Sequence, residues 1–383
     1  MKLKNKSTRR KVKHHKNKSR KGGNVIGSGG FGCVFRPALK CSKKKQRKTN
    51  MVSKLMTRKH AKKEYSTIKE IKKKLKTIPQ YSDYFLVYNV STCNPSQLTK
   101  SDLSNFDEKC KAMKKYDDIT SENVNENLSK LMLLNLPDGG ISLTAYYNNM
   151  KSKADFIFIN EQLQNLLLKG VIPMNKMGVY HGDIKEGNIL FNLNSQKIGL
   201  IDWGLSFYTK SQRPRIPKLL KNKPLQYNLP FSIILFNKTF ENMFTKFAKT
   251  HYSSDELHEF MNQYIELWII ERGKGHMDVI EDIWRIVSNE KDVDITRTFI
   301  VPFLCEIVTK YKKSGKFDKN AYFRDIFLPN LDVWGMLMSY SVVLENNSFN
   351  YGRRLADLYY KFLYSTPTTI IDTNELINEL NNI

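Results

Sequence analysis

A change of hydrophobic pattern near residues 137–143 constrains the fold of this chain most. Before this point, short runs rich in β-branched and aromatic residues predict strands, and residues 59–78 have the apolar spacing of a helix with a lysine-rich outer face. The strands are expected in "NVIGSGGFGCVFRPAL", "NMVSKLM", "YFLVYNV" and "LSKLMLLNL". After it, helical spacing dominates. The sequence therefore predicts an α+β protein with a small strand-rich part over 24–136 and a large, mainly helical part over 137–383.

The excess positive charge is confined to the beginning of the chain. The formal net charge is +26, and all of it arises in residues 1–76, where Glu64 and Glu70 are the only acids. Residues 1–23 are basic and almost without apolar side chains, so we expect them to be disordered. Such a tail can bind nucleic acid or another anionic surface, act as a nuclear address, or only keep the protein soluble. The sequence leaves these alternatives open.

The cysteines and the apolar runs indicate the cellular compartment in which the protein is expected. The five cysteines are odd in number and scattered, which predicts reduced thiols and not a disulfide framework. Cys93 and Cys110 lack the close spacing or neighbouring histidines of a zinc site. No apolar run reaches the roughly 18 residues of a membrane span, and the first residues lack the apolar core of a secretion signal. We therefore expect an intracellular protein, cytoplasmic or nuclear.

A glycine cluster between two predicted strands is suited to holding phosphate groups. It reads Gly27-Ser28-Gly29-Gly30-Phe31-Gly32-Cys33-Val34. Backbone N–H groups approach oxyanions closely only where no Cβ intervenes. Because Val34 continues into a strand and not a helix, we expect a hairpin over a ligand instead of a dinucleotide-binding turn. Lys54, on the next strand, is the candidate cation for the phosphates. Its expected carboxylate partner is Glu64, with Glu70 as the alternative.

The segment "HGDIKEGNIL", followed by "LIDWGLS", brings two carboxylates, an amine and an amide together in sequence. In phosphoryl transfer, Asp183 can orient an acceptor hydroxyl and take its proton, and Lys185 can reach the transferred phosphate. Asn188 and Asp202 offer the hard oxygen ligands that Mg²⁺ prefers, with Mn²⁺ as a substitute. A single Asp or Asn more often caps a turn. The joint spacing H-x-D-x-K-x-x-N with D-W-G is far more specific.

These segments resemble the protein-kinase superfamily in its serine/threonine form. The glycine cluster matches the family's G-x-G-x-x-G-x-V loop. Lys54 matches the family's strand lysine, and Glu64 matches the helix glutamate that pairs with this lysine. The segment from His181 to Asn188 matches the catalytic loop, and Asp202-Trp203-Gly204 matches the D-F-G motif. "LPDGGISL" resembles the hinge and "LDVWGMLMSY" the start of the central helix of the large lobe. More narrowly, the layout is similar to the divergent kinases of giant (nucleocytoplasmic large) DNA viruses.

The resemblance implies a bilobal kinase fold, ATP and Mg²⁺ as cofactors, and transfer of the γ-phosphate to Ser or Thr of protein substrates. It places Asp183, Lys185, Lys54 and Glu64 in catalysis, and Asn188 and Asp202 on the metal. The residues that it implies for nucleotide contact are Ile26, Gly27, Gly29, Gly32, Val34, Lys54, Leu136 and Leu190. The viral likeness implies a host-cell setting, cytoplasmic or nuclear, or packaging in a virion.

The chain departs from the family in its regulatory parts. Gly182 stands where the family has the Arg that pairs with a phosphorylated activation loop, so we expect activity that does not need that phosphorylation. An A-P-E motif is missing, and "PLQYNLPFS" is the candidate substrate-docking segment.

Two insertions are also expected. Residues 92–127 are polar and irregular with some helix. Asp202 and Asp332 lie 130 positions apart, which implies an extra helical block over about 231–320, including a capping box of Ser253 with Glu256. This block either elaborates the core or binds a partner.

Two other functions stay open. The H-G-D…N and I-D-W patterns also resemble small-molecule phosphotransferases of the choline- and aminoglycoside-kinase type, although Lys185 and the full glycine hairpin fit a protein kinase better. A pseudokinase would bind nucleotide without catalysis, but it usually lacks one of the groups that Lys54, Asp183, Asn188 and Asp202 supply here.

Overall fold

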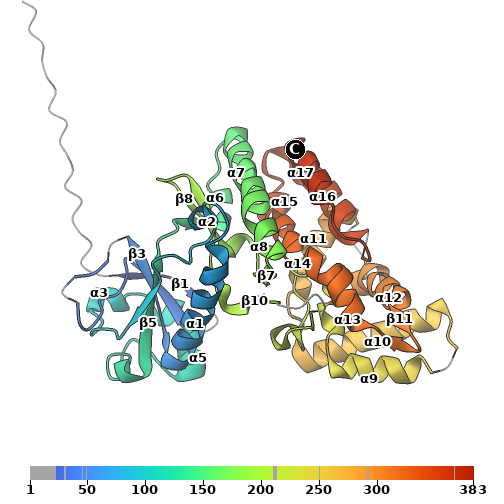
Figure 1. Cartoon of the computed structure of the whole chain (residues 1–383), viewed down its shortest axis with the longest axis horizontal. Helices are drawn as coiled ribbons and strands as arrows, with labels where there is room; N and C mark the ends of the chain where they lie inside the picture. Colours follow the sequence, from blue (N-terminus) through green and yellow to red (C-terminus); the bar gives the residue numbers. More distant parts are fainter. Residues whose placement is uncertain are drawn as a thin grey trace, which may run out of the picture. The chain divides into compact units, whose positions relative to one another are not determined.

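The computed structural model describes residues 23–29, 32–44, 46–48, 50–209, 214–249, 251–290, 293–365 and 367–383. The basic tail, apart from Gly23, and the tip of the glycine loop lie outside the described residues. The protein is α+β and divides into two compact units (Figure 1). The N-terminal unit comprises the chain up to Ala61 together with Ser91–Asn135, and the C-terminal unit comprises Lys62–Val90 and Leu136–Ile383. Each unit is described by itself.

A five-stranded sheet forms the centre of the N-terminal unit. Its order is β1-β2-β3-β5-β4, and the pairs β1–β2, β2–β3 and β4–β5 are antiparallel. The strands are β1 (Asn24–Gly29), β2 (Gly32–Arg36), β3 (Met51–Thr57), β4 (Ser91–Cys93) and β5 (Leu131–Pro137). The predicted strands at "NVIGSGGFGCVF", "NMVSKLM" and "LMLLNL" are therefore confirmed.

The strand predicted at "YFLVYNV" is wrong. In this segment Phe85 makes one isolated bridge, to Leu200, and β4 starts only at Ser91. Phe85 and Val87 are buried and Leu86 and Tyr88 half-buried, so the segment keeps the alternating burial of a strand although it forms only this one bridge among the described residues.

The insertion predicted over 92–127 does contain helices. They are α3 (Lys100–Leu103), α4 (Phe106–Lys109) and α5 (Lys111–Asp117), and they contact β1 and β2. Phe35, Phe106 and Met113 meet in a core that the sheet and these helices share. Asp102 is fully buried, where it accepts hydrogen bonds from the Gly23 N–H and from both terminal nitrogens of Arg47.

The expectation of reduced thiols is wrong. Cys33 is bonded to Cys110 and Cys41 to Cys93, and only Cys305 is free and buried. Both bridges lie in the N-terminal unit, and they join the hairpin side of the sheet to the 92–127 insertion. The pairing follows from packing, because α4 and α5 cover β1 and β2 and thereby bring residues far apart in sequence together.

Helices dominate the C-terminal unit. Helix α1 (Arg58–Leu75) starts in the N-terminal unit and continues in the C-terminal unit. It confirms the helix predicted over 59–78. Two small antiparallel sheets, β6-β8-β9 and β7-β10, accompany the first helices. The elements are α2 (Tyr81–Tyr84), β6 (Ile141–Ser142), α6 (Leu143–Tyr147), α7 (Lys153–Asn165), α8 (Ile172–Lys176), β7 (Val179–Tyr180), β8 (Ile189–Asn192), β9 (Lys197–Leu200) and β10 (Phe207–Tyr208).

The block predicted over 231–320 is helical. It contains α9 (Lys238–Phe247), α10 (Ser254–Arg272), α11 (Met277–Ser288), α12 (Val301–Lys310), the hairpin β11 (Lys312–Lys313) with β12 (Lys316–Phe317), and the start of α13 (Lys319–Tyr322). The capping box is confirmed, since Ser253 accepts from the Glu256 N–H and Glu256 from the Ser253 N–H.

The last helices surround α14 (Leu328–Met338), which is buried along most of its length. They are α15 (Ser341–Glu345), α16 (Gly352–Tyr359) and α17 (Thr373–Asn381). A Cβ on Gly335 would lie 2.6 Å from the Ile184 carbonyl oxygen, so only glycine lets α14 approach the 181–188 segment this closely.

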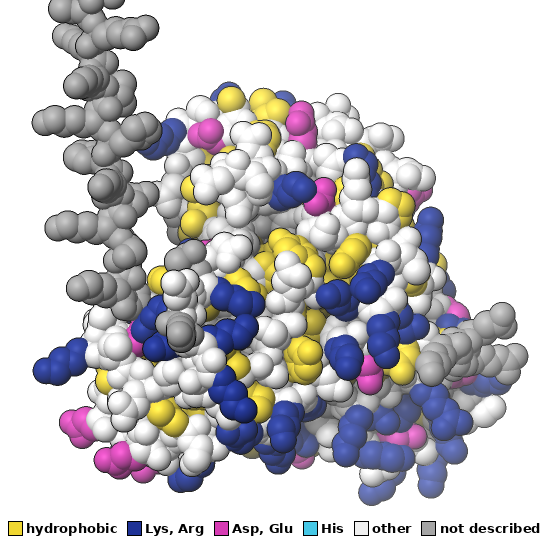
Figure 2. Space-filling model, turned by 60° about the vertical axis from the view of Figure 1, so that its left-hand side comes forward, with side chains coloured by type: hydrophobic (Ala, Val, Ile, Leu, Met, Phe, Trp, Pro, Cys, Tyr) yellow, Lys and Arg dark blue, Asp and Glu magenta, His cyan; other side chains and the backbone are white. Residues whose placement is uncertain are grey.

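No helix among the described residues is both long and apolar enough to cross a membrane. On the face shown in Figure 2, Lys and Arg side chains predominate over Asp and Glu.

Candidate functional site

The carboxylate of Asp183 lies at the centre of a polar cluster in the C-terminal unit. It accepts hydrogen bonds from Lys185 Nζ at 3.2 Å, from Asn188 Nδ2 at 2.9 Å and from Asn228 Nδ2 at 2.9 Å. Its side chain is 14% exposed, so solvent still reaches it. Three donors on a partly exposed carboxylate fix its orientation and leave room for one more partner.

The backbone of this segment is held from α14. Asp332, which is fully buried, accepts from the His181 N–H at 2.8 Å and the Gly182 N–H at 2.9 Å. Burial raises the pKa of Asp332, although the charge of His181 and the two N–H bonds oppose the change. Gly182 has a φ of +68°, where an L side chain costs about 1–2 kcal/mol, and a Cβ there would lie 3.1 Å from the Leu205 carbonyl oxygen.

The two predicted motifs meet through the β8–β9 hairpin. Asn188 precedes β8, and Asp202 follows β9. The Ile201 N–H donates to the Asn188 carbonyl at 3.0 Å, and a ring nitrogen of His181 lies 2.9 Å from the Ile201 carbonyl oxygen. Asp202 has a φ of +60°, in the left-handed region that non-glycine residues rarely adopt. The structure therefore brings Asp183, Lys185, Asn188 and the D-W-G segment together within one unit.

The glycine hairpin and Lys54 lie together in the N-terminal unit. Gly29 pairs with Gly32 across the turn, as the hairpin prediction requires, and Val34 pairs with Lys54 in the next strand. A Cβ on Gly32 would lie 2.3 Å from the Leu55 carbonyl oxygen, so the strands could not pair this closely with another residue there. Lys54 is 7% exposed, which sets it apart from the solvent-exposed lysines around it.

The other predicted residues have different surroundings. Ile26 is 45% exposed, at an irregularity of the β1–β2 register. On α1, Glu64 is half-buried and Glu70 exposed, which favours Glu64 as the inward-facing carboxylate. Leu136 on β5 and Leu190 on β8 are both half-buried.

Three residues around the 181–188 segment were not predicted from the sequence. Asn228, fully buried, binds Asp183 and also donates to the Ile184 carbonyl oxygen at 3.2 Å. The Tyr227 hydroxyl lies 2.9 and 3.0 Å from the two carboxylate oxygens of Glu186, and burial raises the pKa of Glu186. Both Tyr227 and Asn228 belong to "PLQYNLPFS", which the sequence singled out only as a candidate docking segment.

Helix α14 and the insertion both hold this segment. Trp334 Nε1 of α14 donates to the Tyr227 carbonyl at 2.9 Å. Trp268 Nε1 of α10 donates to the Lys223 carbonyl at 3.0 Å, and the His276 N–H donates to the Leu225 carbonyl at 2.9 Å. The insertion thus braces the chain that carries Asn228 to Asp183.

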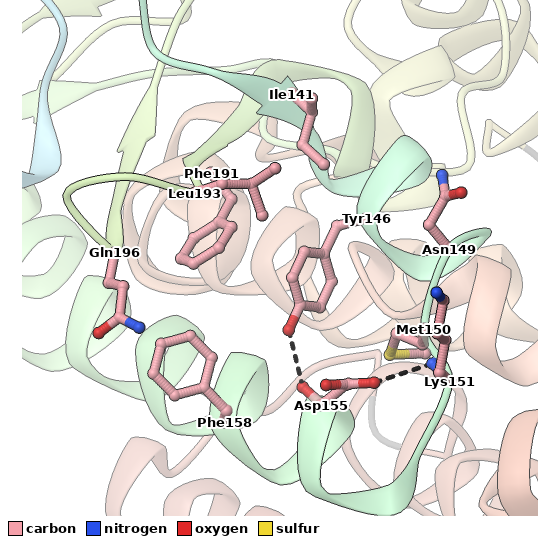
Figure 3. Close-up of a pocket in the computed structure, with 10 residues that line it drawn as sticks. All are labelled: Ile141, Tyr146, Asn149, Met150, Lys151, Asp155, Phe158, Phe191, Leu193 and Gln196. Atoms are coloured by element: carbon pink, nitrogen blue, oxygen red, sulfur yellow. Dashed lines mark hydrogen bonds between the residues drawn. The ribbon is translucent and has the colours of Figure 1, made fainter. Parts of the chain in front are cut away.

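A cavity of about 790 Å³ opens elsewhere in the C-terminal unit (Figure 3). Three aromatic rings, from Tyr146, Phe158 and Phe191, lie close together in its wall. None of the predicted site residues lines it. It is therefore a surface cavity with a mixed apolar and polar lining, separate from the Asp183 cluster.

Among the described residues, no group of three or more His, Cys, Asp or Glu side chains is placed to hold a metal ion. A Mg²⁺ that also binds phosphate oxygens and water needs only one or two protein carboxylates, and Asp202 with Asn188 offers such a set. No family model and no curated protein matches this chain.

Proposed function

We propose that this chain is an ATP-dependent protein kinase that phosphorylates Ser or Thr residues of protein substrates. The observation that carries the proposal is the Asp183 cluster. The Asp183 carboxylate is partly exposed and is held by one amine and two amides, and Asp202 lies on the adjoining hairpin in a left-handed conformation. This arrangement suits a carboxylate that must orient a hydroxyl beside a phosphate.

Each residue has a chemical role in this proposal. Asp183 accepts the proton of the acceptor hydroxyl as its oxygen attacks the γ-phosphorus, and the bond to the β–γ bridging oxygen breaks. Lys185, already bonded to Asp183, balances charge on the transferred group. Asn188 and Asp202 would hold Mg²⁺, and the glycine hairpin with Lys54 would bind the phosphates. Bound Mg²⁺–ATP supplies the phosphoryl group and neutralises part of its charge.

Activity without activation-loop phosphorylation is part of the proposal. Gly182 has no side chain that could pair with a phosphate. The docking segment is instead held by hydrogen bonds within the protein, from Trp334 Nε1 to the Tyr227 carbonyl oxygen and from the Tyr227 hydroxyl to the Glu186 carboxylate. These contacts need no modification to form.

Purified protein with labelled ATP and Mg²⁺ tests the proposal against casein, a basic protein, choline and an aminoglycoside. We expect label on protein and none on the small alcohols. Asp183→Ala should lower turnover by a factor of about 10²–10⁴ while Mg²⁺–ATP still binds. As a matched control, Asp357→Ala removes an exposed carboxylate of α16 and should leave turnover unchanged.

Three results would overturn the proposal. Label on choline or the aminoglycoside alone would identify a small-molecule phosphotransferase. Nucleotide binding without transfer to any acceptor would identify a pseudokinase. Unchanged turnover in Asp183→Ala would remove that residue from its role.

A further inference from the structure

The chain from residue 214 to 228 is basic in a part of the molecule that is otherwise balanced. It contains Arg215, Lys218, Lys221 and Lys223 and no acid, although residues 77–383 as a whole are neutral. Arg215, Lys218 and Lys221 are exposed. None of these four side chains forms an ion pair with any carboxylate that the structure describes. The segment that presents Asn228 to Asp183 therefore also presents unpaired positive charge.

Lys223 lies within electrostatic reach of the 181–188 segment. It is half-buried, and its backbone is fixed by the bond from Trp268. Burial lowers the pKa of Lys223, while Asp183 acts to raise it and Lys185 to lower it further. Both groups of the catalytic loop are thus near enough to affect the Lys223 ammonium electrostatically.

The insertion adds a fifth basic side chain. The loop between α10 and α11 lies against the 224–225 backbone, since a Cβ on Gly275 (φ +62°) would lie 2.2 Å from the Leu225 carbonyl oxygen. This contact places the His276 ring 5.3 Å from the Tyr227 ring. Its Nδ1 is buried and has no hydrogen-bond partner among the described residues. Asp183, Lys185 and Lys223 all act on the pKa of His276, which burial lowers.

Two acids of the neighbouring 181–188 segment, Asp183 and Glu186, already have partners. Asp183 has its three donors and Glu186 has Tyr227. Lys223 and His276 are both close enough to Asp183 to be affected by its charge, so they would also act on a peptide whose acceptor hydroxyl reaches Asp183. An anionic side chain beside the acceptor would be attracted by the positive charge of this segment and could accept a hydrogen bond from the His276 ring, and a cationic one would be repelled.

We propose that residues 214–228, together with His276 of the insertion, select protein substrates that carry anionic side chains next to the acceptor Ser or Thr. The inference rests on the proposed kinase function and names its substrate class. The shared chemistry is a carboxylate or a phosphate within a few residues of the acceptor, supplied by Asp and Glu or by an earlier phosphorylation. On this basis the insertion shapes substrate choice as well as bracing the fold.

Four peptides test the inference. They share one acceptor Ser and differ only in the flanking residues, which are Ala, Asp, phosphoserine or Arg. We expect kcat/KM for the Asp and phosphoserine peptides to exceed that for the Ala peptide by about 5- to 50-fold, mainly through KM, because the contacts are charge-assisted but partly exposed. The preference should shrink in high salt. The Arg peptide should be the poorest substrate, and the two anionic peptides show whether carboxylate or phosphate is preferred.

Variants locate the effect. Arg215→Gln with Lys223→Gln should reduce the ratio of kcat/KM between the Asp and Ala peptides to near one. Lys246→Gln removes an exposed lysine of α9, within the same insertion, and should leave that ratio unchanged. A ratio that survives Arg215→Gln with Lys223→Gln would overturn the assignment to this segment.

The outcomes separate the two proposals. Equal kcat/KM for all four peptides, or a preference for Arg, would overturn the acidic substrate class and leave the kinase function standing. Failure to label any peptide or protein would overturn the kinase function itself.

Discussion

Asp332 offers the sharpest test of how the 181–188 segment is held. Its carboxylate accepts from the N–H groups of His181 and Gly182 and is fully buried, so nothing else can take over these bonds when it is removed. Asp332→Ala leaves both donors unsatisfied. A buried unsatisfied donor costs about 1–3 kcal/mol, so the free energy of unfolding should fall by about 2–6 kcal/mol.

The asparagine variant sets a graded expectation. In Asp332→Asn the amide oxygen can accept one N–H, while the NH₂ group faces the other donor. One donor is then left unsatisfied instead of two, and we expect the free energy of unfolding to fall by about 1–3 kcal/mol. The order of stability should be wild type, then Asp332→Asn, then Asp332→Ala.

Tryptophan fluorescence during urea unfolding measures the free energy of unfolding of the C-terminal unit, in which Asp332 lies. All four tryptophans lie in the C-terminal unit, so their emission reports the unfolding of that unit without a contribution from the five-stranded sheet of the N-terminal unit. Asp357→Ala is the matched control, because it loses only an exposed pair with Arg353 and should change the unfolding free energy by less than about 1 kcal/mol. If Asp332→Ala unfolds like Asp357→Ala, the carboxylate does not hold the loop.

Three further predictions concern other parts of the chain. Asn228→Ala removes a hydrogen bond to a charged group, so kcat on a protein substrate should fall by about 10- to 150-fold; a smaller loss would mean that Asn228 does not position Asp183. Under denaturing, non-reducing conditions one thiol, that of Cys305, should react with iodoacetamide, and after reduction all five should; five before reduction would refute the disulfides. Burial alone would raise the pKa of Asp102, but its bonds from Arg47, Thr99 and Gly23 outweigh burial and lower the pKa below the unfolded value of 3.8. Its contribution is therefore complete above that value and lost as the pH falls through the lower, folded value. In urea unfolding followed by far-UV circular dichroism, the advantage of wild type over Asp102→Asn should be constant above about pH 4 and shrink progressively as the pH falls below it; an advantage that stays constant at lower pH would contradict this assignment.

The Asp183 cluster was partly predictable because most of its residues are close together in sequence. Asp183, Lys185 and Asn188 lie within six positions, and residue types at that spacing are informative by themselves. The α+β division could also be predicted, since strand and helix periods differ and change once along the chain.

What could not be predicted depends on contacts between distant residues. Asn228 lies 45 positions after Asp183, in a segment whose glutamine, tyrosine and asparagine suggest an ordinary loop. The role of Asp332 as an acceptor for two backbone donors appears only when α14 lies against the loop.

The cysteines show the same limit. Number and spacing favoured free thiols, whereas packing of α4 and α5 on the sheet decides which sulfurs meet. The segment from Tyr84 to Val90 has the composition of a strand, but it forms a single bridge, from Phe85 to Leu200, because pairing depends on a partner strand that composition cannot report.

The two disulfides are nested, since Cys41–Cys93 closes a loop inside the one that Cys33–Cys110 closes. Lys43 and Lys44, which are exposed, lie within both loops. A trypsin cut at these lysines would therefore go unnoticed on a non-reducing gel, because two covalent links still join the fragments. The same cut would give two bands once a reductant is added. Comparing limited trypsin digests on gels with and without reductant therefore tests the cross-linking of this sheet directly.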